Sequence, residues 1–225
     1  MYELVTGPLA WLSFLIFFVG VIVRIVFYIR GLDWKLDRVT YSVNTSYGVR
    51  AAIRSVLAWL IPFGTRSWRM NPGFATLFFL FHFGLLFTPV FLLAHNMWLQ
   101  DMIGFGLPAI SGCTADFLTI LVLVCAGLIV LRRIALPEVR ILTDAADIMI
   151  LIIAIAPFIT GYLSAHTTDG GQFWTIIHVL CGEIWLVAIP FTKLSHFVLF
   201  FMSRIQLGMD FGIKRGGMKG SDIVW

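Results

Sequence analysis

The sequence predicts an all-α integral membrane protein with five transmembrane helices, its N-terminus outside and its C-terminus cytoplasmic. Three observations support this fold class. The 225 residues are 60% hydrophobic and only 12% charged, which is more apolar surface than a water-soluble domain can bury. Five apolar segments approach the roughly 20 residues that a helix needs to cross the hydrocarbon layer. The lysines and arginines of the connections all fall on one side of the predicted topology.

The predicted helices begin with a segment near the N-terminus that lacks a basic start and a small-residue cleavage site. We therefore expect this segment to stay in the protein as a membrane helix rather than to be removed as a signal peptide. We expect residues 1–225 to form a single membrane domain. The approximate bounds of the five spans are Pro8–Tyr28, Gly73–Trp98, Phe117–Leu131, Ile148–Leu163 and Phe173–Met202.

The positive charges predict the orientation, because cytoplasmic loops are enriched in lysine and arginine. The first connection, the third connection and the tail at about residues 204–225 carry these cations, whereas the N-terminal stub and the second and fourth connections carry none. This asymmetry is typical of a multi-pass protein of a prokaryotic inner membrane. The cations are Arg30, Lys35, Arg38, Arg50, Arg54, Arg66, Arg69, Arg132, Arg133, Arg140, Arg204, Lys214, Arg215 and Lys219.

The first inner connection, about residues 31–72, contains an amphipathic stretch, VRAAIRSVLAWLIPF, at residues 49–63. Arg50 and Arg54 lie one helical turn apart, and the apolar side chains face another direction. Such a stretch is typical of a helix that lies on the membrane surface. It is also compatible with a docking surface for a cytoplasmic subunit.

Four of the five histidines fall in two predicted spans that run in opposite directions. Matching them by depth pairs His82 with His196 near the inner side, and His95 with His178 near the outer side. Two histidines at equal depth on facing helices can supply both axial ligands of a haem iron, so the pattern predicts two haems b. Buried histidines that bond to neighbouring helices are the alternative, and a zinc site is disfavoured because neither pair has a third ligand nearby.

The spacing of the histidines favours one span more than the other. His178 and His196 are 18 residues apart, about five turns, which places both on one face of an ideal helix. His82 and His95 are 13 residues apart, about 3.6 turns, which separates them by roughly 140° around the axis. A proline lies between the two histidines of each span, and a kink at each proline would absorb the mismatch.

Several polar residues are candidates for supporting roles. Lys193 and Arg132 are expected to contact haem propionates, with snorkelling and topology as their alternative roles. Glu183 lies inside the fifth span, where a carboxyl group has to be protonated, paired or on a water path. His166 and Asp116, near the outer surface, are candidates for moving protons at a quinone.

Three stretches resemble a known family: FLFHFGLL around His82, LRRIALPEVRILTDAADIMILIIA at residues 131–154, and WTIIHVLCGEIWLVAIPFTKLSHFV at residues 174–198. Together they resemble the cytochrome b subunit of respiratory nitrate reductase, the gamma subunit. The wider family includes the membrane subunits of heterodisulfide reductase and of the sulfate reducers' Dsr and Tmc complexes. The chain differs from the nitrate reductase subunit at one ligand position and at one position near the quinone site. These differences favour a subunit of the sulfate-reducer type.

This resemblance implies five transmembrane helices and two bis-histidine haems b. It also implies menaquinone or another quinone near the outer haem, and a cytoplasmic iron–sulfur subunit that exchanges electrons with the inner haem. At the fourth ligand position of the family this chain has Leu92, and His95 is the remaining candidate. Asp116 lies where the family has a lysine. The family's other ligand positions match His82, His178 and His196.

The sequence therefore predicts a dihaem b-type cytochrome subunit of an oxidoreductase complex. It would transfer electrons between a quinone pool, or a periplasmic multihaem cytochrome c, and a cytoplasmic iron–sulfur subunit resembling that of heterodisulfide reductase or nitrate reductase. The alternatives are a cofactor-free proton relay or transporter, and a membrane anchor for a peripheral complex. The three cysteines form neither CxxC nor CxxCH, and membrane lipid rather than nucleic acid is the expected environment.

Overall fold

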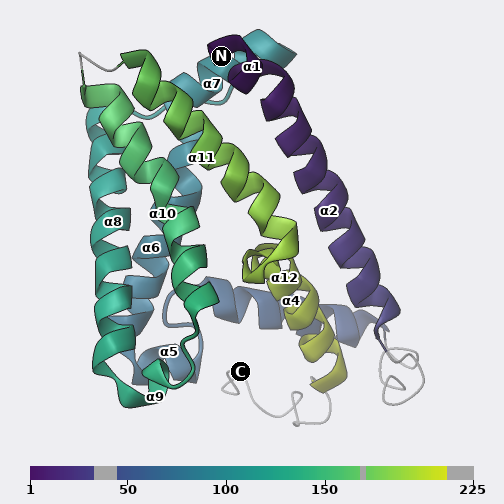
Figure 1. Ribbon diagram of the computed structural model, residues 1–225. Helices are drawn as coiled ribbons and strands as arrows, with labels where there is room; N and C mark the ends of the chain where they lie inside the picture. Colours follow the sequence, from purple (N-terminus) through teal and green to yellow (C-terminus); the bar gives the residue numbers. More distant parts are fainter. Residues whose placement is uncertain (33–44, 168–170, 212–225) are drawn as a thin grey trace. The chain divides into compact units, whose positions relative to one another are not determined.

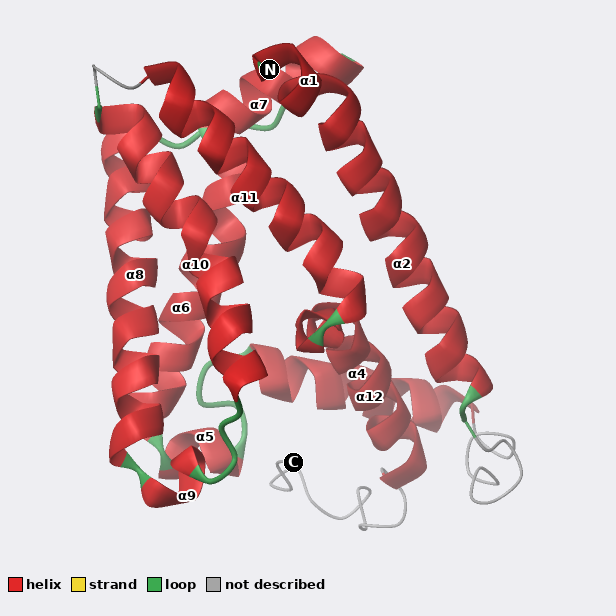
Figure 2. Ribbon diagram, viewed as in Figure 1, coloured by secondary structure: helices red, strands yellow, loops and turns green. Residues whose placement is uncertain are grey.

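The computed structural model describes residues 1–32, 45–167 and 171–211, and this part of the chain is helical, without a strand (Figures 1 and 2). Five described helices are long and apolar enough to span a membrane, which confirms the predicted all-α, multi-pass fold class. Five of the cations used for the predicted orientation, Lys35, Arg38, Lys214, Arg215 and Lys219, lie outside the described residues. The five helices are Tyr2–Arg30, Pro72–Phe91, Gly112–Ala135, Ala145–His166 and Gln172–Phe191.

The first span is built from three consecutive elements: α1 (Tyr2–Leu4), the π-helical turn η1 (Val5–Leu9) and α2 (Ala10–Arg30). The other spans are α6 (Pro72–Phe91), α8 (Gly112–Ala135), α10 (Ala145–His166) and α11 (Gly171–Phe191). The remaining elements are α4 (Thr45–Leu60), α5 (Arg66–Met70), α7 (Leu93–Ile103), α9 (Pro137–Arg140), the 3₁₀ turn η2 (Lys193–Ser195) and α12 (His196–Phe211).

The chain divides into two compact units. The first unit comprises Met1–Ser13 and Thr76–Trp185, and the second comprises Phe14–Ala75 and Leu186–Trp225. Helices α2, α6 and α11 each have residues in both units. The two units are described separately below.

The core of the first unit lies among α6, α8 and α10. Gly84 of α6 comes so close to α8 that a Cβ atom there would lie 2.5 Å from Cγ2 of Val122. Small residues at such contacts let membrane helices pack closely without a hydrophobic driving force between them. Many other large apolar side chains are exposed, where lipid is their natural solvent. The buried core residues are Phe81, Leu85, Val122, Cys125, Ala126, Ala154 and Phe158.

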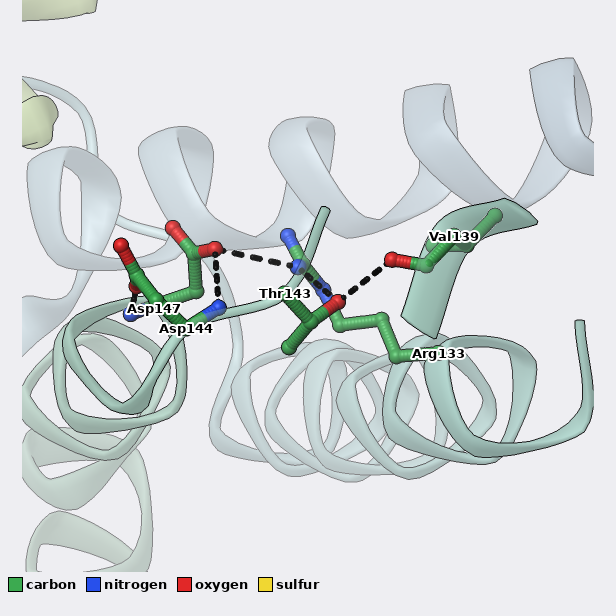
Figure 3. Close-up of polar contacts among 5 residues, drawn as sticks. All are labelled: Arg133, Val139, Thr143, Asp144 and Asp147. Carbon is green, nitrogen blue, oxygen red and sulfur yellow. Dashed lines mark hydrogen bonds and ion pairs between the residues drawn. The ribbon is translucent and has the colours of Figure 1, made fainter. Parts of the chain in front are cut away.

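A polar cluster fixes the connection between α8 and α10 (Figure 3). Asp144 and Asp147 form a capping box at the start of α10, where they bond the backbone N–H groups of the first turn. Arg133, in the last turn of α8, lies 3.5 Å from the Asp147 carboxylate and donates to Thr143 Oγ1 at 3.0 Å. Thr143 in turn donates to the Val139 carbonyl. These bonds link both helix ends through one short loop.

The second unit is held by close helix contacts at glycines. Gly208 of α12 lies against α4, where a Cβ atom would be 2.6 Å from the Ala51 carbonyl oxygen. Gly20 of α2 packs on Pro190, and Arg24 donates to the Pro190 carbonyl oxygen at 2.6 Å. The contact with Pro190 gives Arg24 a structural role inside the protein, in place of the side chain reaching to headgroups.

The fifth predicted span ends earlier than Met202, and this part of the prediction is wrong. Helix α11 ends at Phe191, Thr192 has an extended backbone, and a new helix begins at His196 (Figure 2). Pro190 cannot donate a backbone hydrogen bond, which weakens the last turn. The Thr192 hydroxyl then donates to the Ala188 carbonyl and accepts from Leu194 N, which stabilises the break. His178 and His196 therefore do not share one helix face.

Candidate functional site

The second predicted span also breaks, and the break positions His95. Helix α6 ends at Phe91, Leu92 is extended, and α7 begins at Leu93, so the prediction of one helix to Trp98 is wrong. The His95 ring donates from Nδ1 to the Pro89 carbonyl oxygen at 2.8 Å. Unsatisfied carbonyls at a helix end are costly inside a membrane, and this bond supplies a donor to one of them.

Asn96 completes the cap of α6. Its buried Nδ2 atom donates to the carbonyls of Val90 at 2.9 Å and Leu92 at 3.0 Å, and its Oδ1 atom accepts from Leu107 N at 2.8 Å. The Phe91 carbonyl accepts from Ile110 N at 2.9 Å. The four consecutive carbonyls from residue 89 to residue 92 thus have partners from outside α6. This network holds α7, and with it His95, in one orientation.

His178 on α11 is held in a similar way by α10. Its Nδ1 atom donates to the Pro157 carbonyl oxygen at 2.9 Å, and Thr160 Oγ1 lies 3.4 Å from the same nitrogen. Gly161 makes room for the ring, because a Cβ atom there would lie only 2.9 Å from Cε1 and 3.0 Å from Nδ1 of His178. One turn further along α10, Ser164 and Thr175 share a hydrogen bond of 2.8 Å that ties α10 to α11.

The rings of His95 and His178 point at each other along a common axis. Their Nε2 atoms are 3.5 Å apart, their planes differ by 17°, and their centroids are 5.8 Å apart. In a five-membered ring with bonds of about 1.33 Å, each atom lies about 1.1 Å from the centroid. Adding this radius for both rings to the Nε2 separation accounts for the centroid distance. The two Nε2 atoms therefore lie close to the line that joins the ring centres.

This arrangement suits two axial ligands of one metal. Each Nδ1 uses its proton to bond a carbonyl oxygen, so each neutral ring presents an Nε2 lone pair to the other ring. A metal bonded to both nitrogens at about 2.0 Å needs them about 4 Å apart, roughly half an ångström more than the observed separation. If a haem iron binds here, His95 and His178 would hold it through these two nitrogens. A tetrahedral zinc ion instead needs four ligands at about 109°.

The described residues contain no group of three or more histidine, cysteine or acidic side chains that could hold a metal ion. The chemistry of the donor set is therefore that of a bis-imidazole pair. A haem, which needs two protein ligands, would be held here by His95 and His178 and would supply one-electron chemistry.

His82 and His196, the other predicted pair, belong to different units and are described separately. The His82 ring donates from Nδ1 to the Phe78 carbonyl oxygen at 2.9 Å. His196 opens α12 and donates from Nδ1 to the Lys193 carbonyl oxygen at 2.9 Å. All four predicted ligands thus use Nδ1 on a backbone carbonyl, which leaves Nε2 as the nitrogen with the lone pair. The pairing of His82 with His196 remains a prediction.

Asp116 and His166, two of the predicted proton-transfer candidates, lie in contact. Asp116, in the first turns of α8, lies 3.2 Å from His166 Nε2 at the end of α10. His166 also donates from Nδ1 to the Tyr162 carbonyl oxygen and stacks on the Tyr162 ring, with centroids 4.2 Å apart. Both side chains are about 40% exposed (43% and 39%). A half-exposed histidine–carboxylate pair can exchange protons with water.

The remaining candidates occupy distinct places. Glu183 of α11 is only 7% exposed, and within the described residues neither of its carboxyl oxygens has a hydrogen-bond partner. Lys193 lies in η2 next to His196. Arg132 lies in the last turn of α8, beside the Arg133 that pairs with Asp147. No described contact tests a propionate role for Lys193 or Arg132.

Sequence reasoning missed the residues that orient the ligands, including Pro157, Gly161 and Asn96. A proline carbonyl gives no signal in a sequence, and a glycine that faces a ring cannot be told from any other helical glycine. Asn96 offered a weak signal, because an asparagine directly after an intramembrane histidine is unusual in an apolar run. Its capping role depends on the break at Leu92.

Comparison with known proteins gives one clear relative. No family model matches the chain, and no solved structure matches it. The chain is 50% identical over 226 residues to a curated protein of Nitratidesulfovibrio vulgaris, strain Hildenborough, and the match covers 100% of both chains. Identity at this level over both full lengths means that the two share a fold. The chain therefore belongs to the same protein family as this N. vulgaris protein.

Proposed function

We propose that the chain is a dihaem membrane cytochrome b, the electron-transfer subunit of a larger oxidoreductase complex. The single observation that carries the proposal is the coaxial pair formed by His95 and His178, with Nε2 atoms 3.5 Å apart. Each ring is fixed by a backbone carbonyl, so its lone pair faces the other ring. A haem b held between them supplies one-electron chemistry through its iron. A second haem is proposed between His82 and His196.

The geometry favours haem ligation over a hydrogen bond between the two rings. A hydrogen bond between them would need a proton on one Nε2, and a separation of 3.5 Å exceeds the usual range for such a bond. Two facing lone pairs without a cation between them repel each other. A buried pair of this kind is costly in a membrane unless it binds something.

We further propose an orientation with the N-terminus outside and the C-terminus in the cytoplasm of a prokaryotic inner membrane. The described arginines of α4, α5, α8 and α9 then lie on the cytoplasmic side. In this orientation the His95–His178 pair is the outer site, and the His82–His196 pair is the inner site. Electrons pass between a quinone pool or an outer-side cytochrome c and a cytoplasmic iron–sulfur subunit.

The polar residues take supporting roles in this proposal. Oxidation of a quinol releases two protons with two electrons, and reduction of a quinone takes up the same number. The paired His166 and Asp116 are proposed to carry these protons at the outer surface. Glu183 is proposed to take up a proton when a nearby haem is reduced. Lys193 and Arg132 are proposed to neutralise haem propionates at the inner side.

One observation favours a second candidate, a cofactor-free proton relay. The buried carboxyl group of Glu183 has no partner among the described residues, as expected of a group that exchanges protons with water. Such a relay would contain no haem. Haem content therefore separates the two functions directly.

The test is the haem content and the reduced-minus-oxidised spectrum of the purified full chain. We expect two haems b per chain, and the loss of one in either His95→Ala or His178→Ala. His166→Ala is the matched control, because His166 belongs to neither pair. Loss of one haem in His82→Ala or His196→Ala would support the inner site. Colourless protein, or two haems retained in His178→Ala, would overturn the proposal.

A further inference from the structure

Helix α4 of the second unit has one packed face and one open face. Its packed face carries the small residues Gly48, Ala52 and Ser55, all buried, and Gly208 of α12 lies directly against it. Its open face carries Ile53 and Leu57, which are 54% and 49% exposed. In Figure 1, α4 runs across the direction of α2, which is a membrane-spanning helix. A helix that lies across a span, with apolar side chains exposed, fits the membrane surface.

Two hollows flank the ridge formed by Ile53 and Leu57. The first has a volume of about 470 Å³ and is lined in addition by Arg50, Arg54 and Ile61. The second has a volume of about 350 Å³, lies between α4 and α12, and has a lining that is almost wholly apolar. Apart from the ridge residues, its lining includes Val49, Val56, Ile205 and Met209.

Two guanidinium groups line the first hollow, and neither has a partner among the described residues. Arg50 and Arg54 are four residues apart, hence neighbours on the helix surface, and both are exposed. Neither forms a hydrogen bond or ion pair with any residue that the structure describes. Two other arginines of the second unit are engaged, since Arg24 bonds Pro190 and Arg69 bonds the carbonyls of Phe63 and Gly64. Arg50 and Arg54 thus lie beside apolar hollows and bond no described residue.

We propose that this face binds one anionic diacyl phospholipid. The phosphate lies between Arg50 and Arg54, whose planar forks suit phosphate oxygens, and one acyl chain occupies each hollow on either side of the Ile53–Leu57 ridge. The charge argues for a lipid with net negative charge, such as phosphatidylglycerol, because the cationic head group of a zwitterionic lipid would be repelled by the two arginines. The apolar hollows argue for a lipid rather than a soluble anion. This site is independent of haem binding.

The test is native mass spectrometry of the full chain in detergent, titrated with phosphatidylglycerol or phosphatidylcholine. We expect phosphatidylglycerol to bind more tightly. The double variant Arg50→Gln/Arg54→Gln should weaken its binding about 30-fold, because each arginine near an anionic lipid contributes roughly fivefold. Arg66→Gln/Arg140→Gln removes the same charge from two exposed arginines elsewhere and should bind like the wild type.

A second variant tests the acyl hollow. Met209→Trp fills the apolar hollow and should weaken diacyl phosphatidylglycerol while leaving the single-chain lyso form unchanged. The proposal is overturned if Arg50→Gln/Arg54→Gln binds phosphatidylglycerol like the wild type, or if both lipids bind equally. It is also overturned if the Arg66/Arg140 control loses the same affinity, since net charge alone would then explain binding. Tight binding of a protein partner on α4 that excludes lipid would overturn it as well.

Discussion

Gly161→Ala is the sharpest perturbation of the proposed outer haem site. The added methyl carbon would lie 2.9 Å from Cε1 and 3.0 Å from Nδ1 of His178, whereas packed carbon atoms stay about 3.5–4.0 Å apart. The His178 ring therefore has to retreat by about 0.6–1 Å. Metal–ligand bonds tolerate only about 0.2 Å. The movement also strains the bond from Nδ1 to the Pro157 carbonyl, which sets the ring orientation.

We expect Gly161→Ala to lower affinity for one haem by roughly 10- to 100-fold, the usual cost of disturbing a residue that orients a metal ligand. The assay is haem content together with a redox titration of the purified chain. Gly182→Ala on α11 is the matched control, because a Cβ atom there has nothing within 4 Å. Alanine favours the helix by about 1 kcal/mol over glycine. A loss of haem in Gly161→Ala therefore cannot be explained by a less stable helix. Two haems with unchanged potentials in Gly161→Ala would refute the reasoning.

Three other substitutions test the supporting structure. Asn96→Ala removes the side-chain donor to the Val90 and Leu92 carbonyls, and should lower the free energy of unfolding by about 1–3 kcal/mol and reduce haem content; a melting temperature like the wild type's would contradict the capping role. Gly20→Val drives a side chain into Pro190, where even a Cβ atom would be 2.5 Å from Pro190 Cβ, and should reduce folded yield, while Gly7→Ala in open space should not. Glu183→Gln should keep both haems but flatten the pH dependence of the haem midpoint potential. For a one-electron couple this dependence is at most about 59 mV per pH unit. An unchanged slope would show that Glu183 does not take up the proton.

The sequence predicted the fold class well because membrane spans depend on length and composition, which a sequence displays directly. Helices α8 and α10 were placed within a few residues at most ends, and the proximity of His95 and His178 followed from matching depths on antiparallel spans. The breaks after α6 and α11 were missed. A proline in an apolar run predicts a kink, but whether the helix ends there depends on side chains that supply new hydrogen bonds. Asn96 and Thr192 do this.

The missed breaks explain why the spacing argument failed although His95 and His178 lie close together. On an unbroken helix, the spacing of thirteen residues would place the side chains of His95 and His82 roughly 140° apart around the helix axis. The break at Leu92 removes this constraint, because α7 is a separate segment whose direction is set by its own bonds. The predicted advantage of the 18-residue spacing disappears for the same reason, since Thr192 separates His196 from α11. Helical periodicity constrains ligands only within one continuous helix.

The backbone, rather than a second polar side chain, orients the histidines, and this follows from the membrane setting. A carboxylate that held an imidazole in lipid would bring its own large desolvation cost. A carbonyl at a helix break needs a donor in any case, so the bond from His95 to Pro89 satisfies the carbonyl and fixes the ring tautomer at once. The bonds from His178 to Pro157, a carbonyl inside α10, and from His196 to Lys193 fix the ring tautomer in the same way. Because carbonyls belong to every residue, a sequence displays the histidines but conceals what holds them.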